Sequence, residues 1–205
     1  MTDPVVWPLE IRPHRQSFWL AMRTQRFDNP YDETAQLIEW QGSRWQAELV
    51  LRRAGPAALL IQALVDRIAA SGLALVPDFR RLSARGSLAG TPQVTGGSGG
   101  SLSVTGFTPG ATVLLPGDLV QASPGRAHMV TAPVVAVAGT TPVPIAPPLR
   151  GAVEPGPLVT SAARVRMALV EDAIPNPATA TGRTEWTLAF VEDLSAEGLS
   201  SGGGS

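Results

Sequence analysis

Residues 44–52 read R-W-Q-A-E-L-V-L-R, and this stretch decides the fold. Its apolar side chains fall at every second position and alternate with mostly polar ones, at Trp45, Ala47, Leu49 and Leu51. A period of two is typical of a β-strand that buries one face and exposes the other. The stretch therefore predicts a strand in a sheet that is covered on one side.

The residues that follow predict a helix that covers one face of that sheet. Pro56 opens the run P-A-A-L-L-I-Q-A-L-V-D-R-I-A-A-S, and proline is favoured at a first helical position. Gly72 comes after the run, where glycine can form the left-handed cap of a helix. One face of this helix carries apolar residues at helical spacing, namely Leu60, Ile61, Leu64 and Ile68. We expect this face to pack on the chain's own strands rather than on a partner helix.

Further strands are expected before residue 44. Residues 18–27, F-W-L-A-M-R-T-Q-R-F, have strand character, and D-N-P-Y-D-E supplies turn residues after them. Residues 35–40, A-Q-L-I-E-W, are joined to residues 44–52 by the turn Q-G-S. This spacing predicts a hairpin in which Trp40 and Trp45 face each other across two strands.

The composition changes between residues 83 and 157. Charged residues become rare there, and Gly, Pro, Ser, Thr and Val dominate. Short apolar alternations are separated by turn residues, at 102–104, 112–115, 128–130, 134–137 and 143–145. This pattern is typical of a small β-sandwich or β-barrel. Residues 83–157 therefore predict a compact second module that is rich in strands.

Strand character then returns, in R-V-R-M-A-L-V-E and T-E-W-T-L-A-F-V-E. Because amphipathic strands flank the second module on both sides, we expect an insertion. A sheet-and-helix domain would comprise residues 1–82 and 158–194, with residues 83–157 inserted into it. The predicted fold class is mainly β with one amphipathic helix, a β-sandwich plus helix carrying a small inserted barrel or sandwich. Residues 195–205 are rich in Gly and Ser, which predicts a flexible tail.

The composition argues against several classes of function. A net charge of −1 without a basic run gives no footprint for nucleic acid, so we expect no sequence-specific DNA binding. The chain has no cysteine, which excludes a thiolate nucleophile and a cysteine-ligated zinc. The first residues lack the pattern of a signal peptide, and no apolar run reaches the roughly 18 residues that span a bilayer. We expect no membrane insertion.

Few motifs offer chemistry. The stretch T-G-G-S-G-G-S, residues 95–101, lacks the Gly-Lys-Ser/Thr of a phosphate loop and precedes a strand-like stretch, so it indicates a flexible hairpin. His14 and His128 are the only histidines, and their spacing does not fit a metal site. We therefore expect no metal and no cofactor.

Carboxylates are the remaining candidates for catalysis. Asp118, together with Asp66, Asp78 and Glu171, could supply the carboxylate pair of a glycosidase or cell-wall hydrolase. Asp118 follows Pro-Gly, however, where an aspartate more simply stabilises a turn. We interpret Asp118 as a turn residue and expect the protein not to be an enzyme.

Four segments in sequence carry a resemblance to a known family: L-L-P-G-D-L-V-Q, G-R-A-H-M-V, P-I-A-P-P-L-R-G and R-V-R-M-A-L-V-E. In order and spacing they resemble the distal tail proteins of long-tailed, siphovirus-like bacteriophages and related prophage elements. The stretch G-S-R-W-Q-A followed by one amphipathic helix is similar to the first domain of those proteins, which share their core fold with tail-tube subunits.

The resemblance implies a structural virion protein. It implies a ring of six subunits at the distal end of the phage tail, which joins the tail tube to the hub or baseplate and has its second module outward. The implied partners are other copies of the chain, the tail-tube protein and the hub protein. The implied location is the virion tail, after assembly in the host cytoplasm. The alternatives are a tail-tube or tail-terminator subunit and a carbohydrate-binding module for a host receptor.

The segment P-I-A-P-P-L-R-G, residues 144–151, has a predicted place in this architecture. Pro147 and Pro148 cannot donate ladder hydrogen bonds, so they end a strand. We expect the segment to be the rigid exit from the barrel to the sheet. Arg150 is then a candidate for contact with a neighbouring subunit. The proline-rich loop after residue 171 supplies three more candidates, Pro175, Asn176 and Pro177.

Overall fold

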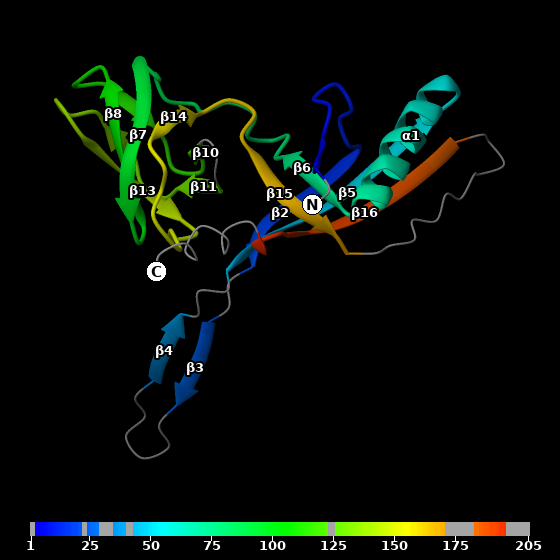
Figure 1. Ribbon diagram of the computed structural model, residues 1–205, viewed down its shortest axis with the longest axis horizontal. Helices are drawn as coiled ribbons and strands as arrows, with labels where there is room; N and C mark the ends of the chain where they lie inside the picture. The colour runs from blue at the N-terminus through cyan, green and yellow to red at the C-terminus, as the bar shows by residue number, and fades with distance from the viewer. Residues whose placement is uncertain are drawn as a thin grey trace, which may run out of the picture.

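The computed structural model describes residues 3–21, 24–28, 35–39, 43–122, 126–170 and 183–195. Within these ranges the chain is mainly β, with one helix, a mixed six-stranded sheet and a closed six-stranded antiparallel barrel (Figure 1). Two separate pairs of strands complete the fold. The predicted fold class is confirmed.

The six-stranded sheet combines strands from before and after the barrel. Its order is β1 (Val5–Val6), β6 (Leu73–Pro77), β15 (Arg164–Leu169), β16 (Arg183–Glu192), β5 (Arg44–Ala54) and β2 (Arg15–Ala21). β1 runs parallel to β6, and all other neighbours are antiparallel. β5 carries the stretch that predicted a half-buried strand, and its alternate residues Trp45, Ala47, Leu49 and Leu51 are buried.

Helix α1 (Pro56–Ser71) covers one face of this sheet. It ends at Gly72, whose left-handed backbone has a φ of 70° and whose N–H donates to the carbonyl of Ile68 at 2.8 Å. Its buried residues are Ile61, Leu64, Val65 and Ile68. The prediction that Leu60 belongs to this face is wrong, because Leu60 is 69% exposed. The buried stripe follows the i, i+3, i+4, i+7 spacing from Ile61, which turns Leu60 to solvent.

The barrel holds the residues of the predicted second module. Its strand order is β10 (Leu119–Ala122), β11 (Ala127–Val130), β13 (Thr141–Ala146), β8 (Ser101–Phe107), β7 (Gly90–Ser98) and β14 (Gly156–Val159). A short pair, β9 (Thr112–Leu114) with β12 (Val134–Val135), accompanies it. The stretch 95–101 forms the end of a hairpin, as the sequence predicts: its first four residues end β7, Gly99 and Gly100 form the turn, and Ser101 begins β8.

The strands after the barrel return to the N-terminal strands. β15 pairs with β6, with Arg164 opposite Pro77, and β16 pairs with β5 over its whole length up to Val191. β15 and β16 therefore lie in the same sheet as the N-terminal strands. β14 is still a barrel strand, however, so the chain leaves the barrel after Val159.

The prediction that residues 144–151 form the exit from the barrel is therefore wrong. Pro147 does follow the last residue of β13, across a cis peptide bond from Ala146. The chain must then still supply β14, because only this strand closes the barrel between β7 and β10. The prolines do end strand β13, but the chain leaves the barrel only after the later strand β14.

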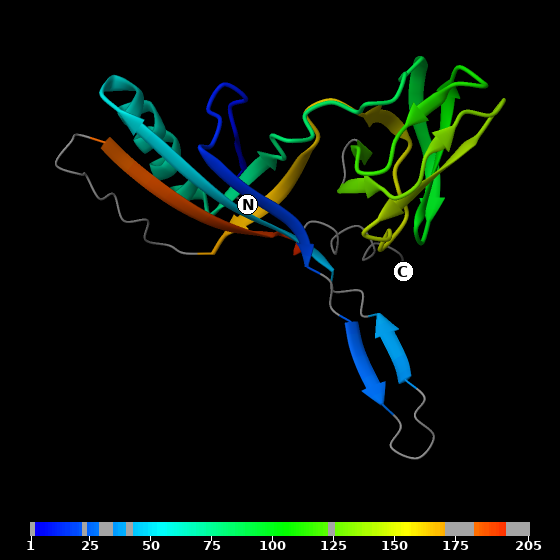
Figure 2. The same cartoon turned by 180° about the vertical axis from the view of Figure 1, so that it is seen from behind.

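A separate hairpin consists of β3 (Thr24–Asp28) and β4 (Ala35–Glu39), with Thr24 opposite Glu39. It stands away from the sheet and the barrel when seen from either side (Figures 1 and 2). The predicted pairing of residues 35–40 with 44–52 is wrong, because β5 lies between β16 and β2 and has no edge left for β4. Trp40 lies outside the described residues.

The molecule has two hydrophobic cores that meet at the base of the barrel. The main core lies between the sheet and α1 and contains the largest buried side chains, Trp7, Trp45, Trp186 and Phe190. The second core fills the barrel with aliphatic residues such as Leu102, Val104 and Val143. Leu119 and Ala127 are barrel residues but belong to the main core. The sheet and the barrel therefore share apolar packing as well as chain connections.

Candidate functional site

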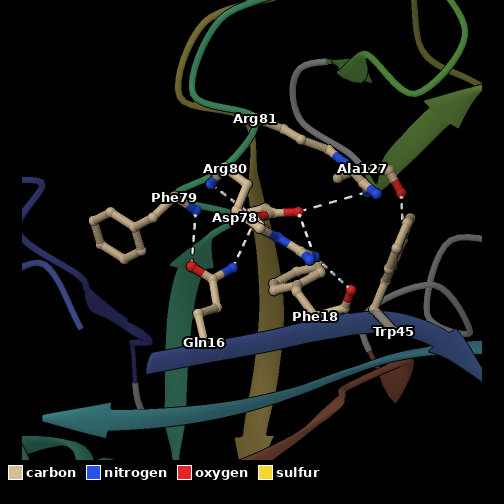
Figure 3. A network of polar contacts seen from close by, with 8 residues as sticks. All are labelled: Gln16, Phe18, Trp45, Asp78, Phe79, Arg80, Arg81 and Ala127. Carbon is tan, nitrogen blue, oxygen red and sulfur yellow. Dashed lines mark hydrogen bonds and ion pairs between the residues drawn. The ribbon is translucent and has the colours of Figure 1, made fainter. Parts of the chain in front are cut away.

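The first feature of the junction between sheet and barrel is the buried carboxylate of Asp78, directly after β6 (Figure 3). Its side chain is fully shielded from solvent and pairs with Arg80 at 3.3 Å and Arg81 at 3.5 Å. The amide of Gln16 on β2 donates to it at 2.7 Å, and the backbone N–H of Arg80 donates at 3.0 Å. Two arginines and two further donors thus surround one buried carboxylate.

The same cluster ties three chain segments together. Gln16 accepts a hydrogen bond from the N–H of Phe79 at 3.1 Å, so both ends of its amide are used. Arg80 also donates to the carbonyl oxygen of Phe18 at 2.8 Å. The edge strand β2 is thereby fastened to the segment through which the chain runs from the sheet to the barrel. Figure 3 shows these contacts converging on Asp78.

Trp45 links the sheet to the barrel directly. Its indole N–H donates to the carbonyl oxygen of Ala127 on β11 at 2.9 Å, and its ring packs against Phe18 with centroids 5.4 Å apart. The side chain is 1% exposed. A buried indole needs such a partner, because an unsatisfied N–H costs free energy away from water. The Trp45 side chain therefore fixes the barrel at a defined position on the sheet.

A buried ion pair lies beside Trp45. Arg126, just before β11, pairs with Glu192 at the end of β16, and their side chains are only 6% and 2% exposed. Glu192 also accepts from the backbone N–H of Trp45 at 2.9 Å, while Arg126 donates to the carbonyl oxygen of Ser43 at 2.8 Å. These contacts again join barrel to sheet. Their burial makes the pair sensitive to the loss of either partner.

Arg150 is placed at this junction. Its guanidinium donates to the same carbonyl oxygen of Ser43 at 3.1 Å. It thus makes a contact across the junction within one chain, and its predicted contact with another subunit stays a prediction. The other candidates for that contact, Pro175, Asn176 and Pro177, lie outside the described residues.

Asp118 plays the turn role expected from the sequence. Its buried carboxylate accepts from the backbone N–H of Leu115 at 2.8 Å and of Arg85 at 3.2 Å, and it pairs with the Arg85 side chain at 2.9 Å. The other glycosidase candidates do not gather around it. Asp66 is exposed on α1 and bonded to Gln62, Asp78 lies in its own cluster, and Glu171 is outside the described residues.

The two histidines have different surroundings. His128 on β11 is 2% exposed, and its Nδ1 lies 2.7 Å from the carbonyl oxygen of Pro147. Burial, and to a smaller extent the positive charge of Arg126, lowers the pKa of His128 to about 4, against the opposite effect of that hydrogen bond. His14 is exposed and precedes β2. Among the described residues, no three His, Asp or Glu side chains are placed to hold a metal ion.

The outer strand of the sheet presents a different kind of surface. β2 is the edge strand of the sheet, and Trp19 on it is 44% exposed although its neighbour Phe18 is buried. The chain continues from β2 towards the projecting hairpin of β3 and β4 (Figure 2). Edge strands present unpaired backbone groups that another chain can complete.

The sequence interpretation missed the polar junction. Arg80, Arg81, Arg126 and Glu192 carry no motif, since single arginines and carboxylates are common on protein surfaces. No helix in the part of the chain that the structure describes is long and apolar enough to cross a membrane. Comparisons with the models of known protein families and with curated proteins find no match for this chain.

Proposed function

We propose that the protein is a structural subunit of a phage tail tip, which assembles into a ring, most simply of six copies, between the tail tube and the hub. The observation that carries this proposal is the open edge of the sheet at β2, next to a hairpin that projects from the body. The order and spacing of the four sequence segments that resemble distal tail proteins support it independently.

An open edge suits assembly by strand addition. A neighbouring copy that pairs with β2 would add partners for backbone groups along this edge other than the carbonyl oxygen of Phe18, which already accepts from Arg80. It would also cover the half-exposed ring of Trp19. Such a contact joins two different surfaces of the same chain, so it is heterologous, and it closes into a ring when the rotation between copies fits. The near-neutral net charge of −1 offers little repulsion between copies.

The junction between sheet and barrel also fits a structural role. Glu192 pairs with Arg126 across two distant segments, and Asp78 is bonded to Gln16 of β2. Trp45 adds apolar packing and a hydrogen bond. A connector between a tube and a hub needs its parts held in one arrangement. In the proposed ring, the sheet domain forms the ring wall and the barrel faces outward.

The structure gives little support to the carbohydrate-binding alternative. Protein sites for sugars commonly use exposed aromatic rings, and Phe107 is the one aromatic residue between residues 83 and 157. Phe107 is only 7% exposed and packs inside the barrel core. A receptor site on the barrel would therefore have to work without aromatic stacking.

The proposal is tested by the oligomeric state. Mass photometry over a concentration series is expected to show a species near about 128 kDa, six times the chain mass of 21.4 kDa, and electron microscopy is expected to show rings. Trp19→Glu places a charge at the open edge and is expected to abolish the rings while leaving a folded monomer. Val137→Glu is the control, because Val137 is 49% exposed but lies in the loop between β12 and β13 rather than on β2.

Two results would overturn the proposal. One is a strict monomer at every concentration that is also absent from the tips of labelled tails. The other is a ring that persists unchanged in Trp19→Glu, which would separate assembly from the edge of β2 and require another interface.

A further inference from the structure

A basic pocket lies at the end of the sheet that points away from the barrel. It is a cavity of about 340 Å³ lined by His14, Arg52, Arg53, Ala54 and Arg183. Arg52 and Arg53 lie near the C-terminal end of β5, and Arg183 is the first residue of β16. The opposite ends of these two strands, at Arg44 and Glu192, lie near the barrel.

The strand register brings these side chains together. Arg183 is directly opposite Ala54 in the antiparallel pair of β16 and β5, and Arg52 is opposite Glu185. The backbone N–H of His14 donates to the carbonyl oxygen of Val50 at 2.7 Å, which holds the segment before β2 against the same end of β5. Three segments that are distant in sequence thus deliver basic groups to one cavity.

Arg53 is held in position inside this group. Its guanidinium donates to the carbonyl oxygen of Arg52 at 2.8 Å and to that of Arg12 at 3.1 Å. Both partners are neutral carbonyl groups, so they orient the guanidinium without cancelling its charge. A guanidinium fixed by backbone contacts loses little freedom when it binds an anion, which favours binding.

Among the described residues, the acidic side chain that the strand pairing brings to the pocket is weakly placed. Glu185 lies 3.8 Å from Arg52, and both side chains are about half exposed, so this pair contributes little. Helix α1 starts two residues after Ala54, and its first turn contains no acidic residue. The described lining of the pocket is therefore mainly arginine.

We propose that this pocket binds a phosphate-bearing anion, with Arg53 as the central ligand and Arg52 and Arg183 beside it. A single carboxylate is satisfied by one bidentate guanidinium, whereas a diphosphate offers several oxygens to guanidiniums that approach from different strands. The volume of the cavity is within the range of small-ligand sites. The inference does not depend on ring formation, because all lining groups belong to one chain.

Calorimetric titration at low ionic strength tests the inference with two probes, inorganic pyrophosphate and ADP. Both are expected to bind. Equal affinity would assign the site to the phosphates alone, and tighter binding of ADP would assign it to a nucleotide-borne diphosphate. Citrate, which carries carboxylates of similar total charge, is the comparison anion and is expected to bind more weakly.

Variants localise the binding. Arg53→Gln and Arg183→Gln are each expected to weaken pyrophosphate binding about tenfold, because each removes charge-assisted hydrogen bonds. Arg67→Gln is the matched control, since Arg67 is exposed on α1 outside the pocket. Thermal melting of each variant separates loss of binding from loss of folding. If Arg53→Gln unfolds, the Arg183→Gln variant still tests the site, because Arg183 is exposed.

The inference is wrong under three results: no pyrophosphate binding at millimolar concentration, binding that is unchanged in both pocket variants, or citrate binding as tight as that of pyrophosphate. Each of these outcomes is independent of whether rings form, so failure of this inference leaves the proposed assembly role intact.

Discussion

At the scale of single residues, the buried carboxylates in the described part of the chain are all paired. Asp78, Asp118 and Glu192 are buried carboxylates, and each pairs with at least one arginine. Hydrogen bonds from arginine and from backbone N–H groups tie each of these carboxylates to other parts of the chain. We therefore interpret these residues as structural groups that hold chain segments together. The contribution of each one to the free energy of unfolding depends on how deeply it is buried.

The first prediction concerns the pair of Arg126 and Glu192. Arg126→Met leaves the carboxylate of Glu192 buried without its cation, so we expect the free energy of unfolding to fall by about 3–5 kcal/mol. Arg15→Met, which breaks the exposed pair with Glu48, is expected to cost less than about 1 kcal/mol. Urea denaturation at neutral pH measures both values, and equal effects of the two substitutions would contradict the structural role of the buried pair.

The second prediction is a pH dependence from His128. Its pKa is lowered to about 4 in the folded protein, from the usual 6.5. Between these values the unfolded chain binds a proton that the folded chain does not, so the free energy of unfolding falls as the pH is lowered from 6.5 to 4. The loss at the acid end is expected to reach about 3 kcal/mol.

His128→Gln removes the titrating group and provides the comparison. Denaturation at several pH values is expected to show a smaller loss for the variant than for the native chain over the same window. If the free energy of unfolding depended on pH in the same way for both proteins, His128 would not be the group that causes the loss of stability.

At the scale of elements, helix α1 and the interior strand β5 show which features follow from local sequence and which depend on packing. The period of β5 and the Pro56 and Gly72 signals describe local structure well, because strand alternation and helix caps depend on neighbouring residues. The exact face that a helix buries depends instead on the sheet it meets, as the exposure of Leu60 shows.

The third prediction tests that face. Leu64 is 4% exposed in the main core, so Leu64→Ala is expected to reduce the free energy of unfolding by about 2–5 kcal/mol through lost burial and a new cavity. Leu60→Ala, one turn earlier and 69% exposed, is expected to change it by less than about 0.5 kcal/mol. Thermal or urea unfolding compares the two leucines, and equal losses would place Leu60 in a contact that the isolated chain lacks.

The sequence could predict the element types and the insertion but not the strand partners around residue 40. Alternating apolar and polar residues on both sides of the barrel were sufficient to expect β15 and β16 in the N-terminal sheet. Which strand lies beside β5 is decided by long-range packing of Phe18 against Trp45, which a short turn such as Q-G-S cannot reveal. The junction was invisible for the same reason, since Arg126 and Glu192 are 66 residues apart.

At the scale of the whole molecule, the sheet and the barrel act as one unit with an open side. The base of the barrel contributes Leu119 and Ala127 to the main core, and the polar junction surrounds this contact. The open side is the edge at β2 and the hairpin beyond it (Figure 1). The proposed role in assembly rests on this open edge.

The fourth prediction follows from this division. The purified chain is expected to hydrolyse neither peptidoglycan nor host polysaccharide, because the described carboxylate candidates are separated or bound to arginines. Release of reducing sugars over a long incubation measures this. Turnover that Asp118→Asn abolishes while the fold survives would contradict the prediction and restore the hydrolase alternative.

The chain passes into the barrel from β6 and returns from it into β15, and these two strands are neighbours in the sheet. Their antiparallel register, with Pro77 opposite Arg164, puts both connections at the same end. Tension applied to the barrel would therefore pull both strands lengthwise in the same direction. The ladder of β15 with β16 would be loaded in shear, where several hydrogen bonds must break together, rather than peeled open one bond at a time. The attachment is mechanically strongest along the axis of those strands.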